Sequence, residues 1–155
     1  MRNLKGVANM KSLKELYVCE NELTDIRGLE ALPALWRVSV RNNKLKNIYN
    51  PFPTLPALTY LNLRENQIAK IEDVKKIDQH VTGINLLANP VTDELGEGFR
   101  RDIVTGLPWI CRLNKQDVTV EERVTFEKEM IEKEKERLAA EEEARKAAEE
   151  KEAEG

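Results

Sequence analysis

Hydrophobic residues recur along the first 90 residues in a pattern that ends each time on an asparagine. Within each copy, apolar residues two positions apart point to one side of a strand, and the residues between them point outward. We therefore expect four short parallel strands that stack into a curved sheet. The four copies are Leu13-x-x-Leu16-x-Val18-x-x-Asn21, Leu35-x-x-Val38-x-Val40-x-x-Asn43, Leu58-x-x-Leu61-x-Leu63-x-x-Asn66 and Val81-x-x-Ile84-x-Leu86-x-x-Asn89.

The asparagines Asn21, Asn43, Asn66 and Asn89 are spaced by 22, 23 and 23 residues. Each follows its strand directly, where the chain turns away from the sheet. The side-chain amide can pair backbone groups of that turn that would otherwise be buried without partners. The sequence thus predicts an asparagine ladder along a solenoid.

Apolar residues three positions apart follow two of the asparagines, which predicts 3₁₀-like or irregular segments on the convex side. These residues are Leu23, Ile26, Leu29 and Leu32, and then Ile68, Ile71, Val74 and Ile77. In the second repeat, prolines at 51 and 53 interrupt this period, and we expect Phe52 and Leu55 to fill the core there by another route.

The chain begins in the phase of a repeat, because Leu4, Val7 and Met10 precede Ile26, Leu29 and Leu32 by 22 residues. No strand and no asparagine stand ahead of them. We expect either a longer parent chain, which we favour, or a partner that covers the apolar face of the first repeat. That face would comprise Leu4, Val7, Leu13 and Leu16.

Residues 1–88 are therefore predicted to be repeats, 89–118 a C-terminal cap and 119–155 a long helix. In the cap we expect Asp93 to begin a helix over 94–105 with Phe99 inward, and a strand over 107–113. Trp109 and Leu113 are expected to cover the last core face, with Cys111 buried beside Trp109. A capping box at 119–122 predicts a helix over 120–151.

Charge separates these parts: residues 1–118 carry 17 basic and 14 acidic side chains, whereas 119–155 carry 8 and 14. Val124, Ile131 and Leu138 recur every seven residues in the predicted helix, but acidic residues occupy the companion positions. We therefore expect a single helix whose first turns pack on the repeats or on a neighbour, and not a self-sufficient coiled coil. No apolar run is long enough to cross a membrane.

The outward strand positions form the concave face, where solenoids of this type bind. Its basic and aromatic residues can take an acidic protein segment; the alternative is a solvated face without a ligand. The candidate binding residues are Tyr17, Arg37, Arg41, Tyr60, Asn62, Arg64 and Asn85. Three arginines and an acidic tail argue against nucleic acid. Because the sequence holds no nucleophile motif, metal-ligand spacing or phosphate loop, we expect neither an enzyme nor a cofactor.

The four phrases carry the signature of leucine-rich repeats, which implies an α/β solenoid. They resemble the class with a period near 22 residues, found in phosphatase regulators, the spliceosomal A-prime protein and axonemal proteins. The segment from Asn89-Pro90 through Phe99-Arg100 to Leu107-Pro108-Trp109-Ile110-Cys111-Arg112-Leu113-Asn114 resembles the cap motif of that class, which usually has Tyr at position 99 and Asp at position 114.

A closer resemblance covers residues 55–140. Leu86-Leu87-Ala88-Asn89-Pro90-Val91-Thr92-Asp93-Glu94, Arg112-Leu113-Asn114-Lys115 and Glu121-Glu122-Arg123 before a charged helix are similar to the family of leucine-rich repeat-containing protein twenty-three, a radial-spoke component of cilia. The resemblance implies a structural subunit of the ciliary axoneme that docks radial-spoke proteins. The alternative is a nuclear splicing or phosphatase-regulatory adaptor with the same fold.

Overall fold

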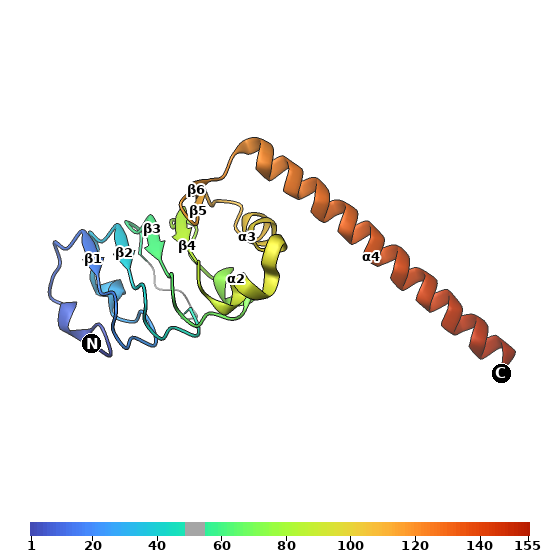
Figure 1. Ribbon diagram of the computed structural model, residues 1–155, viewed down its shortest axis with the longest axis horizontal. Coiled ribbons are helices and arrows are strands. Elements are labelled where there is room, and N and C mark those ends of the chain that lie inside the picture. The colour runs from blue at the N-terminus through green and yellow to red at the C-terminus, as the bar shows by residue number, and fades with distance from the viewer. Residues whose placement is uncertain (49–54) are drawn as a thin grey trace. The chain divides into compact units, whose positions relative to one another are not determined.

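The computed structural model describes residues 1–48 and 55–155 and divides them into two units, residues 1–119 and 120–155. In the first unit, the strands lie side by side along one edge and short helical segments lie on the opposite side (Figure 1). Within the described residues the sheet has the order β1 (Glu15–Tyr17), β2 (Arg37–Ser39), β3 (Tyr60–Asn62), β4 (Gly83–Asn85), β5 (Arg112–Leu113) and β6 (Gln116–Asp117). Strands β1 to β5 are parallel, and β6 pairs with β5 antiparallel. The predicted α/β solenoid is confirmed.

The central apolar residue of each repeat phrase lies in the core, at one level of the sheet. Leu16, Val38, Leu61 and Ile84 are paired in register across β1 to β4, and Leu113 of β5 follows them. All five are buried. Stacking joins the apolar faces of separate repeats into one continuous core, which stabilises strands only two or three residues long.

The convex side is built from single turns, as the three-residue period predicts. They are the 3₁₀ turns η1 (Lys5–Val7) and η2 (Leu29–Ala31) and the one-turn helix α1 (Ile71–Val74). Val74 and Ile77 are buried, and so is Leu55. The expectation for Phe52 lies outside the described residues.

The asparagine ladder is present and joins each repeat to the next. The side-chain Nδ2 of Asn43 donates to the carbonyl oxygens of Val18 and Val40, both at 2.9 Å, and its Oδ1 accepts from the Leu23 N–H at 3.0 Å. Asn66 and Asn89 repeat these contacts one and two repeats further along. All three are buried, so the ladder supplies partners to backbone groups that water does not reach.

The residue before each asparagine has a positive φ, between 54° and 58°, at Glu20, Asn42, Glu65 and Ala88. A left-handed residue is uncommon outside glycine and turns the chain sharply. The sharp turn at the end of each strand aims the asparagine side chain back beneath the sheet, and the same device recurs in all four repeats.

At the first repeat, Met1 takes the place of Leu23 in the register, since its nitrogen contacts the Oδ1 of Asn21 at 2.7 Å. Leu4, Val7 and Leu16 are buried within the chain itself, with η1 beside them. These three side chains are therefore covered by the described residues themselves. Met10 is exposed and Leu13 half-buried.

The cap differs from its prediction in three ways. Helix α2 (Pro90–Leu95) begins after Asn89, so Asp93 lies inside a helix and does not cap one. A positive φ of 54° at Gly96 ends it, and η3 (Gly96–Gly98) leads into α3 (Phe99–Gly106). The strand predicted over 107–113 is shorter, since β5 spans Arg112–Leu113.

The cap nevertheless covers the core with the predicted residues. Phe99, Ile103, Val104 and Leu113 are buried, while Trp109 is half-buried. Cys111 is exposed, because residue 111 lies ahead of β5 in the position that Thr82 holds ahead of β4, outside the core. Asn114 donates its backbone N–H to the Ile84 carbonyl at 3.0 Å, and its Oδ1 accepts from the Leu86 N–H at 2.7 Å, the role an Asp would fill.

The second unit is one helix, α4 (Val120–Glu154), which contains 35 residues and continues three residues past its predicted end. None of its side chains is buried. The ion pair between Glu142 and Lys146 is present at 3.1 Å, and Arg137 contacts both Glu134 and Glu141. Pairs three and four residues apart stabilise a helix that lacks a buried face.

Candidate protein-binding surface

The concave face is the outer side of β1 to β4, and its side chains stand in columns set by the strand register. Glu15, Arg37, Tyr60 and Gly83 form the first column, and Tyr17, Ser39, Asn62 and Asn85 the second. Arg41 and Arg64 follow the strands in a third column. The register thus brings together six of the seven candidate binding residues as predicted; Asn85 occupies its column but not the surface.

Arg37 and Tyr60 form the centre of the first column. The guanidinium carbon of Arg37 lies 4.8 Å from the centroid of the Tyr60 ring, a cation–π contact. Gly83 makes room for the ring, since a Cβ at residue 83 would lie 3.0 Å from Cδ2 of Tyr60. The stack of Arg37, Tyr60 and Gly83 therefore depends on a glycine in β4.

A group of charges lies at the ends of the strands. Glu65 accepts from Nε and Nη2 of Arg41, each at 3.2 Å, and lies 3.5 Å from Nε of Arg64. The hydrogen bond from Arg41 holds the pKa of Glu65 below its ordinary value, and the same bond raises the pKa of Arg41. These groups are solvent-exposed, so their contribution to stability is small. Two arginines share Glu65 here, and Glu20 is a second acid close enough to raise the pKa of Arg41.

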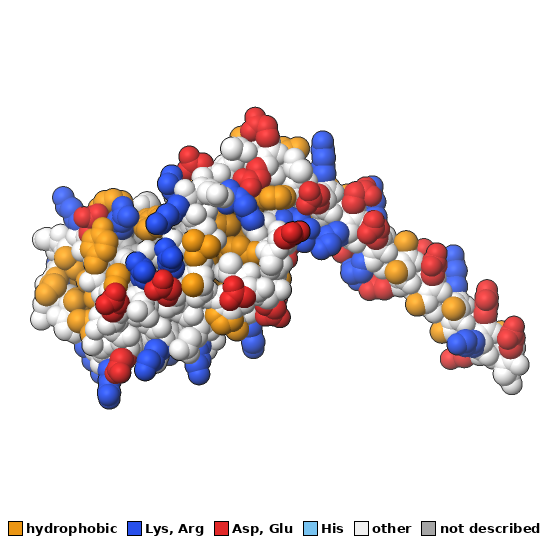
Figure 2. Space-filling view, in the orientation of Figure 1, with side chains coloured by type: hydrophobic (Ala, Val, Ile, Leu, Met, Phe, Trp, Pro, Cys, Tyr) orange, Lys and Arg blue, Asp and Glu red, His pale blue; other side chains and the backbone are white. Residues whose placement is uncertain are grey.

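Two large aromatic side chains are exposed at the first two strands. Tyr17 is 58% exposed and Trp36 is 40% exposed. Trp36 lies directly ahead of β2, in a column whose other members are Lys14, Thr59 and Thr82. Sequence analysis missed it, although a tryptophan in a column of otherwise polar residues is a detectable signal. Figure 2 shows hydrophobic and basic side chains next to each other over this part of the repeats.

The two asparagines of the second column turn back onto their own strands. Oδ1 of Asn62 accepts from the Arg64 N–H at 3.0 Å, and Oδ1 of Asn85 accepts from the Leu87 N–H at 3.1 Å. Asn85 is fully buried. The prediction that it is exposed for binding is wrong, because its side chain folds back onto the Leu87 N–H and is enclosed there.

Three polar atoms of this face are buried without a hydrogen-bond acceptor in the described part of the chain: Nε of Arg37, Nε of Arg64 and Nδ2 of Asn85. Buried donors are normally paired, so each marks a place where an acceptor is favoured. Arg64 Nε lies 3.5 Å from Oε1 of Glu65, whereas the Arg37 guanidinium lies over the Tyr60 ring. The Nδ2 of Asn85 is enclosed with the rest of its side chain.

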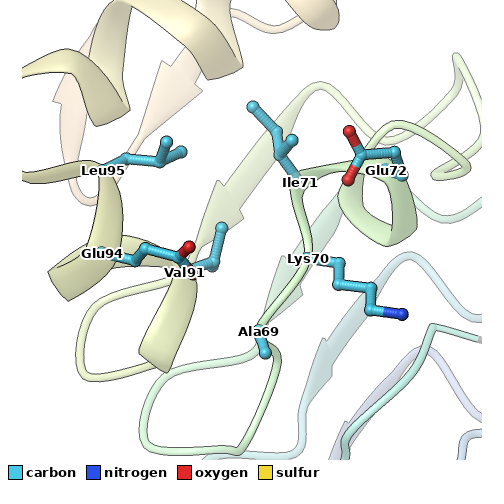
Figure 3. A pocket seen from close by; sticks show the side chains of 7 residues that line it. All are labelled: Ala69, Lys70, Ile71, Glu72, Val91, Glu94 and Leu95. Atoms are coloured by element: carbon cyan, nitrogen blue, oxygen red, sulfur yellow. The ribbon is translucent and has the colours of Figure 1, made fainter.

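Other parts of the molecule offer less chemistry. A pocket of about 170 Å³ lies between the segment that begins at Ala69 and helix α2. In Figure 3, Ile71 and Leu95 face the same space from opposite segments, and Lys70 points away. Among the residues that the structure describes, no group of three or more His, Cys, Asp or Glu side chains could hold a metal ion. Within the same residues, no helix has the length and apolar character to span a membrane.

No protein-family model matches the chain. Leucine-rich repeat-containing protein 23 of Xenopus tropicalis is 36% identical over 103 residues, and the human protein of that name is 31% identical over 108. The structure of the Drosophila melanogaster SNF/U2A′ complex contains a chain that matches with a TM-score of 0.71 and 20% identity, over 83% of this chain and 73% of that one. The chain has the leucine-rich repeat fold.

The chain aligns with only part of each relative. It spans 29% of the Xenopus protein and 31% of the human one, and the alignments cover 65% and 68% of this chain. Acidic leucine-rich nuclear phosphoprotein 32 family member A of Drosophila melanogaster is 28% identical over 72% of this chain. The similar proteins therefore carry different names.

Proposed function

We propose that this leucine-rich repeat protein is a non-catalytic scaffold that binds another protein through its concave face. One observation carries the proposal: Tyr17 of β1, Arg37 of β2 and Trp36 directly ahead of β2 are of the three residue types that dominate protein interfaces, and both aromatic side chains are exposed. The large area of each ring is gained at a low cost in conformational entropy. Repeat solenoids bind through such a rigid face.

The charges of the face indicate the kind of partner segment. Arg37, Arg41 and Arg64 place three guanidinium groups in the columns of this face, and Glu65 contacts the last two of them. Carboxylates are the acceptors that match guanidinium groups best. The proposed ligand is therefore an acidic protein segment that carries apolar side chains for Tyr17 and Trp36.

The proposed assembly is the radial spoke of motile cilia, with the protein as a structural subunit of the axoneme and a cytoskeletal location. Support comes from the resemblance of the segments 86–94 and 112–115 to the family of leucine-rich repeat-containing protein twenty-three. The identity of 31% to 36% over about two thirds of this chain agrees with that resemblance. Small molecules, nucleic acids and membranes are not among the proposed partners.

The test uses purified full-length protein with demembranated axonemes. Bound protein is chemically crosslinked and its neighbours are identified by quantitative mass spectrometry. The wild type is expected to enrich radial-spoke proteins, and the double variant Tyr17→Ala/Arg37→Ala to lose them. Gln79→Ala, in an exposed turn ahead of β4, is the matched control. Enrichment that survives the double variant would reject the concave face, and enrichment of other axonemal proteins alone would reject the spoke.

A second candidate is a nuclear adaptor that serves splicing or regulates a phosphatase. The similarity over 72% of the chain to a protein named as an acidic leucine-rich nuclear phosphoprotein favours it. Nuclear retention in ciliated cells, with copurification of splicing factors or a phosphatase catalytic subunit and without spoke proteins, would select this candidate over the first.

A further inference from the structure

An apolar stripe runs along α4 and remains in contact with solvent. Val120, Val124, Ile131 and Leu138 are between 43% and 75% exposed. The last three are seven residues apart, so they lie on one side of the helix, and Val120 lies one turn ahead of Val124. From Val120 to Leu138 the stripe extends about 27 Å at 1.5 Å per residue. A straight stripe of this length matches another helix, because helices bury apolar residues at this period.

An acidic column lies directly beside the stripe. Glu127, Glu134 and Glu141 each follow a stripe residue by three positions, which is the second core position of a seven-residue repeat. Two copies of α4 paired in parallel would place these carboxylates against each other. Like charges at such positions select against parallel self-pairing and in favour of a different partner.

Arg137 offsets part of this charge without removing it. It contacts Glu134 and Glu141 from within the same helix, and its hydrogen bond lowers the pKa of Glu134. Three acidic side chains, Glu127, Glu134 and Glu141, therefore stand against one base along this column. Over residues 119–155 the balance is 14 acidic against 8 basic side chains. A partner that approaches this helix is attracted if it is basic.

We propose that α4 binds a helix of a different chain, whose seven-residue repeat carries apolar residues at one core position and Lys or Arg at the other. Apolar residues of the partner cover Val124, Ile131 and Leu138, and its basic residues meet the acidic column. Long Lys and Glu side chains pack their stems along the seam while their charged ends reach water. The proposal is independent of the concave face, since it uses only residues of the second unit.

The experiment titrates full-length protein into a labelled synthetic helix of about four seven-residue repeats, with Leu at one core position and Lys at the other. Fluorescence anisotropy measures the affinity. A matched peptide carries Glu in place of Lys and is expected to bind at least about tenfold more weakly, since three opposed pairs become like-charged. Ile131→Ser should weaken the Lys peptide by a similar factor, and circular dichroism verifies that the variant stays helical.

Charge-reversal variants distinguish binding through the acidic column from attraction to the net charge of the helix. The triple variant Glu127→Lys/Glu134→Lys/Glu141→Lys should reverse the preference and bind the Glu peptide. The control Glu132→Lys/Glu136→Lys/Glu143→Lys changes net charge equally on another side of the helix and should keep the original preference. Equal binding of both peptides, no binding of either, or reversal by the control would overturn the proposal. Sedimentation of the free protein as a dimer joined by α4 would also overturn it.

Discussion

The ladder residue Asn66 is the most direct place to perturb the fold. Its Nδ2 donates to the carbonyl oxygens of Val40 at 3.1 Å and Leu63 at 3.0 Å, and its Oδ1 accepts from the Leu45 N–H at 3.1 Å. Asn66→Ala leaves the buried Leu45 N–H without a partner and removes one of the two amide donors to the Val40 and Leu63 carbonyl oxygens, which still accept from Asn43 and Asn89. The unsatisfied N–H costs about 1–3 kcal/mol and the lost hydrogen bonds add about 1 kcal/mol, so we expect a loss of about 2–4 kcal/mol in the free energy of unfolding.

The assay is urea unfolding followed by tryptophan fluorescence. Trp36 and Trp109 are the two tryptophans of the chain and both lie in the first unit, so the helical signal of α4 does not enter. Asn21→Ala is the internal control. Asn21 is half-buried and its Nδ2 contacts only carbonyls of its own repeat, Val18 and Cys19, so its loss should cost about 1 kcal/mol. If Asn66→Ala were no more destabilising than Asn21→Ala, the ladder would not join the repeats energetically.

Three further predictions concern the face and the helix. Gly83→Ala should displace the Tyr60 ring and destabilise the first unit by about 1 kcal/mol, measured by the same fluorescence assay. Arg41→Ala should raise the pKa of Glu65 toward its ordinary value, which carboxyl-carbon NMR measures. Because Arg41 lowers that pKa, the favourable interaction between the two side chains is present when the pH is above the ordinary pKa of Glu65 and is lost as the pH falls through the lowered pKa. Truncation after Leu138 should leave the unfolding midpoint of the first unit unchanged, and a lower midpoint would show that the distal helix belongs to the core.

The strand register could be predicted from the sequence because each repeat contributes the same two constraints. An apolar pair two residues apart fixes which side of the strand enters the core, and an asparagine three residues later fixes where the strand ends. Leu61 and Asn66 lie where that reasoning places them. A shift of the strand register by one residue would turn the apolar side chains toward solvent, so the pattern of apolar residues is compatible with one register only.

The structure of the cap was harder to predict from the sequence because its local signals compete. Asp93 is a good N-cap residue, but Pro90 at the first helical position starts the helix earlier. The hairpin from β5 to β6 turns through Asn114 and Lys115, both with positive φ. Hairpins of that kind usually carry a glycine at the second position, and lysine there gives no sequence signal.

The candidate site was predicted in its columns but not in its exposures. Strand alternation places Tyr17 and Asn85 on the same side, yet Tyr17 extends into solvent and Asn85 is fully buried. The short amide of Asn85 bonds its own backbone and is therefore not exposed, and strand alternation alone does not predict such a bond. Trp36 lies ahead of its strand, where alternation does not apply, and so the strand pattern did not reveal it.

Site-specific photocrosslinking inside the intact assembly shows whether the concave face holds a protein partner. A benzophenone amino acid at position 17 is compared with the same group at position 79. We expect a crosslink to one protein species from position 17, mapped to an acidic segment of that protein, and none to that protein from position 79. Equal crosslinking from both positions, or a silent position 17 in a functional assembly, would show that the partner binds elsewhere.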